Sequence, residues 1–283
     1  MTTTTSSMPN TLPVLAFIGA GNMAQAIIKG LLQQGYEANK IIATGRTSSK
    51  LQVLSETTGI SVSLDNQDAC QQADIIILGV KPQMMQNTIQ ALSDAIDPQR
   101  HLIISVAAGV LAESINGWLG KHCATVRCMP NTPSLVGMGA SGLHANELVS
   151  SQQKSLAEQI MQAVGICIWL EDEQLIDAVT AVSGSGPAYY FLMMEAMITG
   201  AQELGLNADQ AQALVLQTAA GAAVMAQQSS HSPEQLRLAV TSPMGTTEQA
   251  LNSFAANNYQ TTVTTAMQAA YHRSQELAQA FKS

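Results

Sequence analysis

The stretch FIGAGNMA at residues 17–24 decides the fold of this chain. It ends an apolar run and opens a helical pattern over residues 22–34. Within it, Gly19 makes a tight turn, Gly21 lets the backbone approach a pyrophosphate, and Ala24 lets the helix pack closely on the strand. A pyrophosphate would then lie over the free N–H groups at the start of the helix. The stretch therefore predicts a dinucleotide-binding βαβ unit, and the alternative is a tight turn without a ligand.

Outward from this stretch, short apolar runs alternate with helical patterns. The runs occupy residues 14–18, 41–44, 75–80, 102–106 and 124–127, with helical patterns at 22–34, 48–57 and 84–96 between them. Two further runs, at 139–143 and 166–170, flank a helical pattern at 151–164. This rhythm predicts an α/β fold in which helices cover both faces of a Rossmann-like parallel sheet.

The second half of the chain is typical of helices alone. Residues 174–281 show no strand pattern, and the helical pattern at 187–204 is apolar almost all round. Such a helix needs burial on most of its sides, which a small domain cannot supply by itself. We therefore expect an all-α dimerisation domain that packs against a second copy of the chain, since closed homodimers are the commonest assembly. Asn207 and Pro233 are expected to mark the starts of two of its helices.

Composition narrows the class of protein. The chain has 283 residues, of which 46% are hydrophobic and 11% charged, and it carries a net charge of −8 with only 12 Lys and Arg residues. Such a chain neutralises few phosphates, so we expect no nucleic-acid partner. No apolar run is long enough to span a bilayer and the N-terminus has no signal-peptide pattern, so we expect a cytoplasmic protein with no membrane partner. Cys70, Cys123, Cys128 and Cys167 lack metal-site spacing and are expected to be buried, reduced thiols, with no metal.

The residues that follow the second strand indicate whether the chain binds NAD or NADP. Enzymes that use NAD usually carry Asp or Glu there for the ribose hydroxyls. This chain has Arg46, Thr47 and Ser48 instead, and no acid. Arg46 can pair with a 2′-phosphate, and the two hydroxyls can donate hydrogen bonds to it. The sequence therefore predicts NADP(H), and the alternative is that Arg46 is a solvated loop charge.

The ends of further strands extend the predicted site, because ligands of open α/β sheets lie beyond the carboxyl ends of the strands. Small residues and prolines at 79–82, 107–109 and 128–133 suit a wall that admits a flat ring, and Lys81 fits either a phosphate or ribose contact or an ordinary surface charge. The predicted cofactor contacts are Ile18, Gly19, Ala20, Gly21, Asn22, Met23, Arg46, Thr47, Asn66, Val80, Lys81, Pro82, Ala107, Ala108, Gly109 and Asn131. We expect a disordered tail over residues 1–12, an NADP-binding Rossmann-like domain over 13–172, and a helical dimerisation and substrate domain over 173–283.

Six segments, in order along residues 13–280, resemble those of pyrroline-5-carboxylate reductase. They are FIGAGNMA at 17–24, VKPQ at 80–83, AAGV at 107–110, MPNTP at 129–133, VSGSGPAY at 182–189 and TSPMGTT at 241–247. The first is shared with many dehydrogenases, whereas the last two are close to diagnostic. The resemblance implies that NADPH delivers hydride to C5 of 1-pyrroline-5-carboxylate and gives L-proline, the last step of proline biosynthesis. It also implies a Rossmann-like domain followed by a helical dimerisation domain, in dimers that commonly assemble into decamers.

The segment at 241–247 is the predicted substrate clamp. A carboxylate over the N-terminus of the following helix would accept hydrogen bonds from the backbone N–H groups of Gly245, Thr246 and Thr247. The resemblance implies that the Thr247 hydroxyl also bonds the ring nitrogen, which makes Thr247 the predicted catalytic residue. The alternative is an ordinary helix N-cap by Thr246. The family usually has glycine where this chain has Met244, which would be strained if its φ were positive.

Two glycines and a proline interrupt the helical pattern at 183–189. Inside a helix, glycine and proline cost about 1 and 3 kcal/mol respectively. We therefore predict that the irregular backbone at this point has a function, and Ser185, Gly186 and Pro187 are assigned to the substrate site. The alternative is that the segment only changes the direction of the chain. Glu173 is assigned there by analogy, as a charge that balances an iminium, and its alternative is a surface charge.

Two other functions fit the first half of the chain. A β-hydroxyacid dehydrogenase-like enzyme shares this layout but uses a lysine of the helical domain as acid and base, and here the only lysine after Lys154 is Lys282. A non-catalytic NADP(H)-binding regulatory protein would lack the clamp at 241–247. The missing lysine argues against the first alternative and the clamp argues against the second.

Overall fold

The computed structural model describes residues 12–281, in two compact units. The first unit contains the residues up to Gly184 together with those from Ala270 onward, and the second contains Ser185–Ala269. Contacts thus place residues 173–184 and 270–281 with the first unit, whereas the sequence pattern placed the start of the helical domain at residue 173. The predicted tail over residues 1–12 lies outside the described residues, apart from Leu12.

An eight-stranded sheet forms the centre of the first unit. Its strands are β1 (Leu15–Ile18), β2 (Ile41–Thr44), β3 (Ser61–Ser63), β4 (Ile75–Leu78), β5 (Leu102–Ser105), β6 (Ala124–Met129), β7 (Gly139–Ala145) and β8 (Gly165–Trp169). Their order is β3-β2-β1-β4-β5-β6-β7-β8, and all neighbours are parallel except β6 and β7. The predicted Rossmann-like fold is confirmed. The edge strand β3 reads Ser-Val-Ser, so it has no apolar run that would predict it from the sequence.

Helices connect the strands, and several begin at identifiable caps. They are α1 (Asn22–Gln33), α2 (Ser48–Thr58), α3 (Asn66–Gln72), α4 (Pro82–Leu92), α5 (Ala112–Leu119), α6 (Ser151–Gln162) and α7 (Leu175–Val179), with 3-10 turns η1 (Ala38–Lys40), η2 (Ser93–Ala95) and η3 (Thr132–Val136) and a π turn η4 (Thr180–Gly184). Asp65 accepts hydrogen bonds from the first turn of α3, and Ser150 forms a capping box with Gln153 at α6. These caps satisfy N–H groups that a helix leaves free at its start, which fixes where each helix begins.

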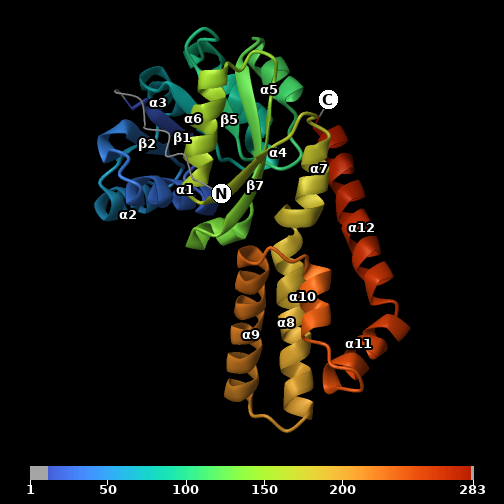
Figure 1. Ribbon diagram of the computed structural model, residues 1–283. Coiled ribbons are helices and arrows are strands. Elements are labelled where there is room, and N and C mark those ends of the chain that lie inside the picture. Colours follow the sequence, from blue (N-terminus) through green and yellow to red (C-terminus); the bar gives the residue numbers. More distant parts are fainter. Residues whose placement is uncertain (1–11, 282–283) are drawn as a thin grey trace. The chain divides into compact units, whose positions relative to one another are not determined.

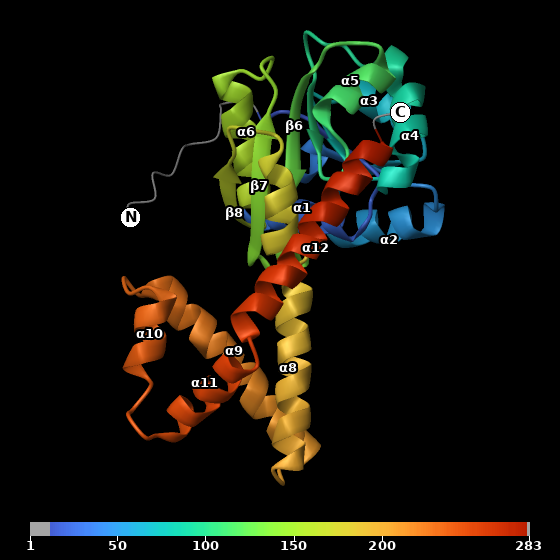
Figure 2. The ribbon, with the colours of Figure 1, turned by 90° about the vertical axis from the view of Figure 1, so that its right-hand side faces the viewer.

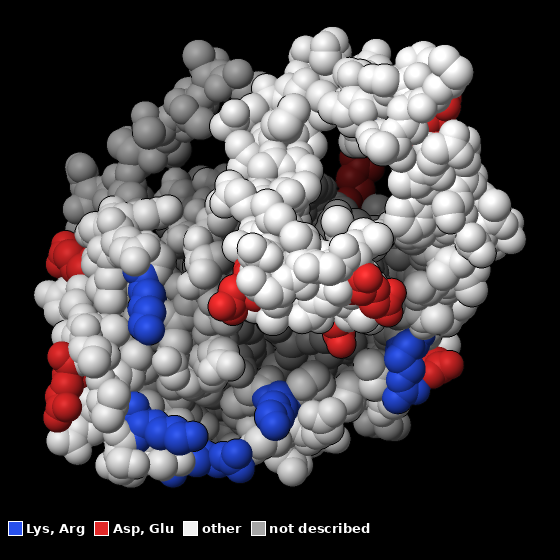
Figure 3. Space-filling model, turned by 90° about the horizontal axis from the view of Figure 1, so that it is seen from below, with Lys and Arg blue, Asp and Glu red and all other residues white. Residues whose placement is uncertain are grey.

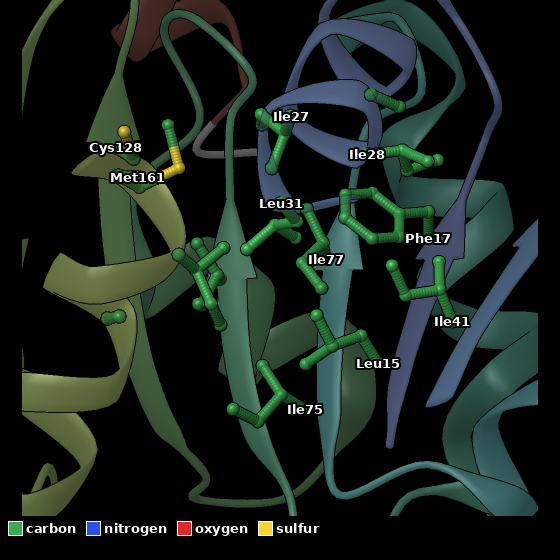
Figure 4. Close-up of a cluster of buried hydrophobic side chains, with 14 of the residues drawn as sticks. Leu15, Phe17, Ile27, Ile28, Leu31, Ile41, Ile75, Ile77, Cys128 and Met161 are labelled. Atoms are coloured by element: carbon green, nitrogen blue, oxygen red, sulfur yellow. The ribbon is translucent and has the colours of Figure 1, made fainter. Parts of the chain in front are cut away.

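Buried side chains alternate between the two faces of the sheet. In β1, Leu15 and Phe17 point into one apolar cluster and Ile18 points into the other, as expected for side chains that alternate along a strand. Figure 4 shows the first cluster, to which α1 contributes Ile27. Burial on both faces explains why the parallel strands read as continuous apolar runs.

The last part of α12 (Tyr259–Ala280) returns to the first unit. Buried Ser274 donates a hydrogen bond from its hydroxyl to Asp177 Oδ1 at 2.6 Å. Leu277 packs closely on Gly109. A Cβ placed on that glycine would lie only 3.2 Å from Leu277 Cβ. The first unit is therefore completed by residues that come from both sides of the second unit in the sequence.

The second unit consists of helices. They are α8 (Gly186–Glu203), α9 (Ala208–Gln228), α10 (Pro233–Ala239), α11 (Thr246–Ala256) and the first part of α12. The long helices α8 and α9 run side by side (Figures 1 and 2). Asn207 caps α9 and Pro233 begins α10, as the sequence predicts. Across residues 12–281, no helix has both the length and the apolar character that a membrane crossing requires.

Most apolar side chains of the second unit are exposed. Among its described residues, only Gly186, Ala211 and Val215 are buried, whereas Tyr190 is 70% exposed and Phe191 63%. Figure 3 shows one face of the molecule, on which uncharged residues, drawn white, cover more of the surface than charged ones. Apolar surface on this scale is typical of an interaction face.

Candidate functional site

The glycine-rich turn joins β1 to α1. Gly19 has φ +98°, and a Cβ there would lie only 2.9 Å from Val80 Cγ1, so the turn requires glycine. Gly21 is the exposed N-cap of α1 and offers no side-chain cap. The first N–H groups of α1 are therefore free for an anion. Ala24 is buried, and a Cβ on Gly79 would lie 3.6 Å from Ala24 Cβ, which is the close helix–strand packing that the sequence predicts.

A cleft of about 620 Å³ opens beside this turn, at the carboxyl ends of β1, β2 and β4. Its lining includes seven of the predicted cofactor residues, namely Gly19, Ala20, Arg46, Thr47, Asn66, Val80 and Lys81. The sequence reasoning missed other lining residues, among them Gln25, Thr44, Lys50 and Leu64. The sequence does carry a signal for Lys50, because this cation lies in the first turn of the helix that follows Thr47. A larger hollow of about 920 Å³ lies between α1 and α2, but the glycine-rich turn contributes nothing to it.

The remaining predicted cofactor residues do not line this cleft. Ile18, Gly21 and Pro82 are chain neighbours of lining residues, and Asn22 and Met23 lie between the lining residues Ala20 and Gln25. Ala107, Ala108 and Gly109 follow β5, and Asn131 follows β6. They lie at the ends of the next two strands of the sheet, so they belong to the same edge.

The charge of the cleft favours NADP(H) over NAD(H). Arg46, Thr47 and Lys50 line it, and none of its described lining residues is acidic. Thr47 is the N-cap of α2, but its side chain makes no capping hydrogen bond. A phosphate dianion requires positive charge and hydrogen-bond donors. The two cations, the hydroxyl and the free N–H groups at the start of α2 supply both. The residues present thus fit a nucleotide with a 2′-phosphate.

Asn131 is bound within the protein through both of its polar side-chain atoms. Its Nδ2 donates to the carbonyl oxygen of Ser183 at 3.0 Å, and its Oδ1 accepts from the backbone N–H of Ala140 at 2.9 Å. The side chain therefore ties the loop after β6 to the π turn η4 and to β7. A cofactor contact by Asn131 stays a prediction.

Glu173 has a partner that the sequence did not reveal. Its Oε1 accepts hydrogen bonds from Arg127 Nη1 at 3.0 Å and from the backbone N–H of Ala112 at 2.8 Å. Arg127 lies in β6 and is buried. A guanidinium in that position needs an anion, so the alternative of Glu173 as a simple surface charge is wrong. The one signal in the sequence was an arginine inside an apolar strand.

The predicted substrate clamp forms a tight turn before α11. Gly245, not Thr246, is the N-cap of α11, so the alternative of an N-cap by Thr246 is wrong. The N–H of Gly245 donates to the carbonyl oxygen of Ser242 at 3.0 Å, so the prediction that this group is free for a carboxylate is also wrong. Gly245 has no side chain to cap the helix. The first free donors at this helix start are therefore the N–H groups of Thr246 and Thr247.

Met244 adopts a left-handed backbone conformation, with φ +58°. Its side chain is 90% exposed, and its N–H donates to Glu248 Oε2 at 2.8 Å. This conformation is unfavourable for a residue with a Cβ, so the strain that the sequence predicts at this position is present.

The irregular segment at 183–189 is a π turn followed by a new helix. The turn η4 ends at Gly184, and Ser185 is the N-cap of α8, with Gly186 and Pro187 in its first turn. A Cβ on Gly184 would lie 2.5 Å from Met129 Cε, so this glycine permits close packing within the first unit. Pro187 is tolerated because the first turn of a helix does not use its N–H. The predicted interruption of the helix is confirmed, whereas substrate contacts by these residues stay a prediction.

Two family models match the chain. The model for pyrroline-5-carboxylate reductase dimerisation matches residues 173–277, and the model for NADP oxidoreductase, coenzyme F420-dependent, matches residues 14–109. The first covers the helical unit and the second covers the glycine-rich turn and the cleft beside it.

Whole-chain relatives carry the same description. A pyrroline-5-carboxylate reductase of Pseudomonas aeruginosa is 50% identical over 94% of this chain and 97% of the relative, and one of Haemophilus influenzae is 42% identical over 95% and 98%. The solved structure of a pyrroline-5-carboxylate reductase from Coxiella burnetii has a TM-score of 0.91 and 44% identity, covering 95% of this chain and 99% of that one. The pyrroline carboxylate reductase of Plasmodium falciparum, solved with NADP bound, has a TM-score of 0.84 and 28% identity, covering 96% and 100%.

Proposed function

The chain belongs to the pyrroline-5-carboxylate reductase family, and on that premise we propose that it reduces 1-pyrroline-5-carboxylate to L-proline with hydride supplied by NADPH. This reaction is the last step of proline biosynthesis. The observation that carries the conclusion is that 50% identity to a reductase extends over 94% of the chain, so the match includes both the dinucleotide-binding residues and the helical unit.

The cleft beside the glycine-rich turn is the proposed cofactor site. The free N–H groups that follow Gly21 receive the pyrophosphate. Arg46, Thr47 and Lys50 receive the 2′-phosphate, because a guanidinium, a hydroxyl and an ammonium all donate to phosphate oxygens. The strand ends at 80–82 and 107–109, together with Asn131, are proposed to lie along the nicotinamide half of the cofactor.

The start of α11 is the proposed substrate site. The N–H groups of Thr246 and Thr247 bind the carboxylate, and the Thr247 hydroxyl holds the ring nitrogen. A cyclic imine protonates readily, so the site must orient two rings rather than supply a strong acid. Ser185–Pro187 are proposed to line the same site. Glu173 receives no substrate contact in this scheme, because its carboxylate neutralises Arg127.

The helical unit is proposed to pair with a second copy, and the resulting dimers to assemble into decamers in the cytoplasm. Its exposed apolar side chains and the match to a dimerisation model over residues 173–277 support pairing. For function we keep the division into a cofactor domain over 13–172 and a dimerisation and substrate domain over 173–283, because the dimerisation model begins at residue 173.

The direct test is loss of NADPH absorbance in the presence of racemic pyrroline-5-carboxylate, with NADH in parallel. We expect turnover with both coenzymes and a lower KM for NADPH. A protein that binds NADPH but does not oxidise it with this imine would be the regulatory protein instead. Oxidation of a β-hydroxyacid is not expected, because after Lys154 the sequence has no lysine before Lys282.

A further inference from the structure

The hydrogen bond between Met244 and Glu248 lies inside the proposed substrate clamp. The N–H of Met244 donates to Glu248 Oε2 at 2.8 Å, across the start of α11. In an ordinary capping box, the glutamate at the third helical position reaches back to the N–H of the N-cap. Here the N-cap is Gly245 and its N–H already donates to Ser242, so Glu248 reaches one residue further back.

This bond fixes a residue that is otherwise held poorly. Met244 has φ +58°, which is unfavourable for any residue with a Cβ. Its side chain is 90% exposed, so packing contributes little to holding it. A Cβ on Gly245 would lie 2.9 Å from the carbonyl oxygen of Ser242, so the turn is also tight at its next residue. The bond from Gly245 to Ser242 closes the turn around Met244, and the carboxylate of Glu248 adds the side-chain contact that offsets the strain at Met244.

We propose that Glu248 is a positioning residue for substrate binding, which holds the turn at 242–245 in the shape that presents the N–H groups of Thr246 and Thr247 to the substrate carboxylate. The inference rests on the proposed function of this segment. The contribution of Glu248 is a hydrogen-bond acceptor at Met244 rather than a charge, since a negative charge beside an anionic ligand opposes binding. A glutamine would keep the acceptor oxygen and remove the charge.

The test uses the full chain with the variants Glu248→Ala, Glu248→Gln, Met244→Gly and the double variant Met244→Gly/Glu248→Ala. Loss of a single hydrogen bond corresponds to up to about a tenfold change in binding. We therefore expect Glu248→Ala to raise the KM for the imine by about tenfold and to leave the KM for NADPH unchanged. Glu248→Gln should have a KM near or below that of the wild type.

A double-mutant cycle separates positioning from simple stabilisation of the helix. Glycine adopts positive φ without strain, so Glu248→Ala should raise the KM for the imine by only about twofold in the Met244→Gly background. The control is Glu234→Ala, which removes an exposed acid from the first turn of another helix in the same unit. It should leave both KM values unchanged.

Hydrogen exchange of the segment 242–248 gives a readout that does not depend on turnover. We expect faster exchange in Glu248→Ala and near wild-type exchange in Glu248→Gln. An unchanged exchange rate and an unchanged imine KM in Glu248→Ala would overturn the proposal, as would equal effects of alanine and glutamine or an undiminished effect in the Met244→Gly background. Failure of the proposed function is distinct, because the wild-type protein would then not oxidise NADPH with the imine at all.

Discussion

Glu173 Oε1 lies 3.0 Å from Arg127 Nη1 and neutralises a guanidinium that is buried in the sheet. The other ion pairs among the described residues, Arg100–Asp74 and Arg273–Glu276, have side chains that are at least 44% exposed. We expect Glu173→Ala to lower the thermal midpoint by roughly 5–10 °C, since it leaves a buried cation without its anion. The matched control, Glu276→Ala, breaks an exposed pair and should have almost no effect. Equal, small shifts in the two variants would contradict a structural role for Glu173.

Arg46 is expected to decide the coenzyme preference. Arg46→Asp replaces a partner of the 2′-phosphate with a charge that repels it, so the KM for NADPH should rise at least about tenfold while that for NADH stays the same or falls. Lys40→Asp is the control, because Lys40 precedes β2 and Arg46 follows it, at the opposite end of the same strand. An unchanged KM for NADPH in Arg46→Asp would leave Arg46 as a solvated loop charge.

Thr247 is expected to act through its hydroxyl. Thr247→Ala should lower kcat by about tenfold, the equivalent of one hydrogen bond to a charged ring nitrogen. The thermal midpoint should not change, because the side chain is exposed. Thr57→Ala removes a hydroxyl that bonds carbonyls of its own helix and should leave turnover unchanged. An unchanged kcat in Thr247→Ala would show that the hydroxyl has no part in turnover.

Gly19 is required by the geometry of the first turn. Gly19→Ala adds a Cβ at φ +98° and 2.9 Å from Val80 Cγ1, so we expect lower stability and loss of NADPH binding, measured by calorimetry. Gly117→Ala is the control, because that glycine lies inside α5 with no atom near its Cβ position. It should stabilise the fold by about 0.5–1 kcal/mol. Unimpaired NADPH binding by Gly19→Ala would contradict the role of this turn.

The thiols are expected to make the first unit sensitive to alkali. Burial raises the pKa of the Cys70 and Cys167 thiols to about 12, from an ordinary value of 9.0. Because the unfolded chain ionises first, their stabilising contribution is complete below pH 9 and is lost as the pH rises toward 12. The thermal midpoint should therefore fall between about pH 8 and about pH 10, and less so in Cys70→Ala. Rapid alkylation of native Cys70 near pH 8 would show that the thiol is not protected.

The centre of the sheet could be predicted because β1, β2, β4 and β5 are buried on both faces and therefore appear as largely apolar runs. The glycine-rich turn could be predicted because its geometry has no room for a Cβ at Gly19, so the residue type itself reports the turn. The pairing of Arg127 with Glu173 could not, since 46 positions separate two residues that meet only in the folded protein. The hydrogen bond that occupies the Gly245 N–H was also hidden, because it depends on the path of one turn rather than on residue type.

The return of α12 to the first unit has a genetic consequence. A premature stop codon anywhere in the helical unit would spare every residue that lines the cofactor cleft, yet it would remove Ser274 from Asp177 and Leu277 from Gly109. The truncated product would therefore lose support for the loop after β5, whichever of its helices remain. We expect such nonsense alleles to encode a first unit that is less stable, although every residue that lines the cleft is still present.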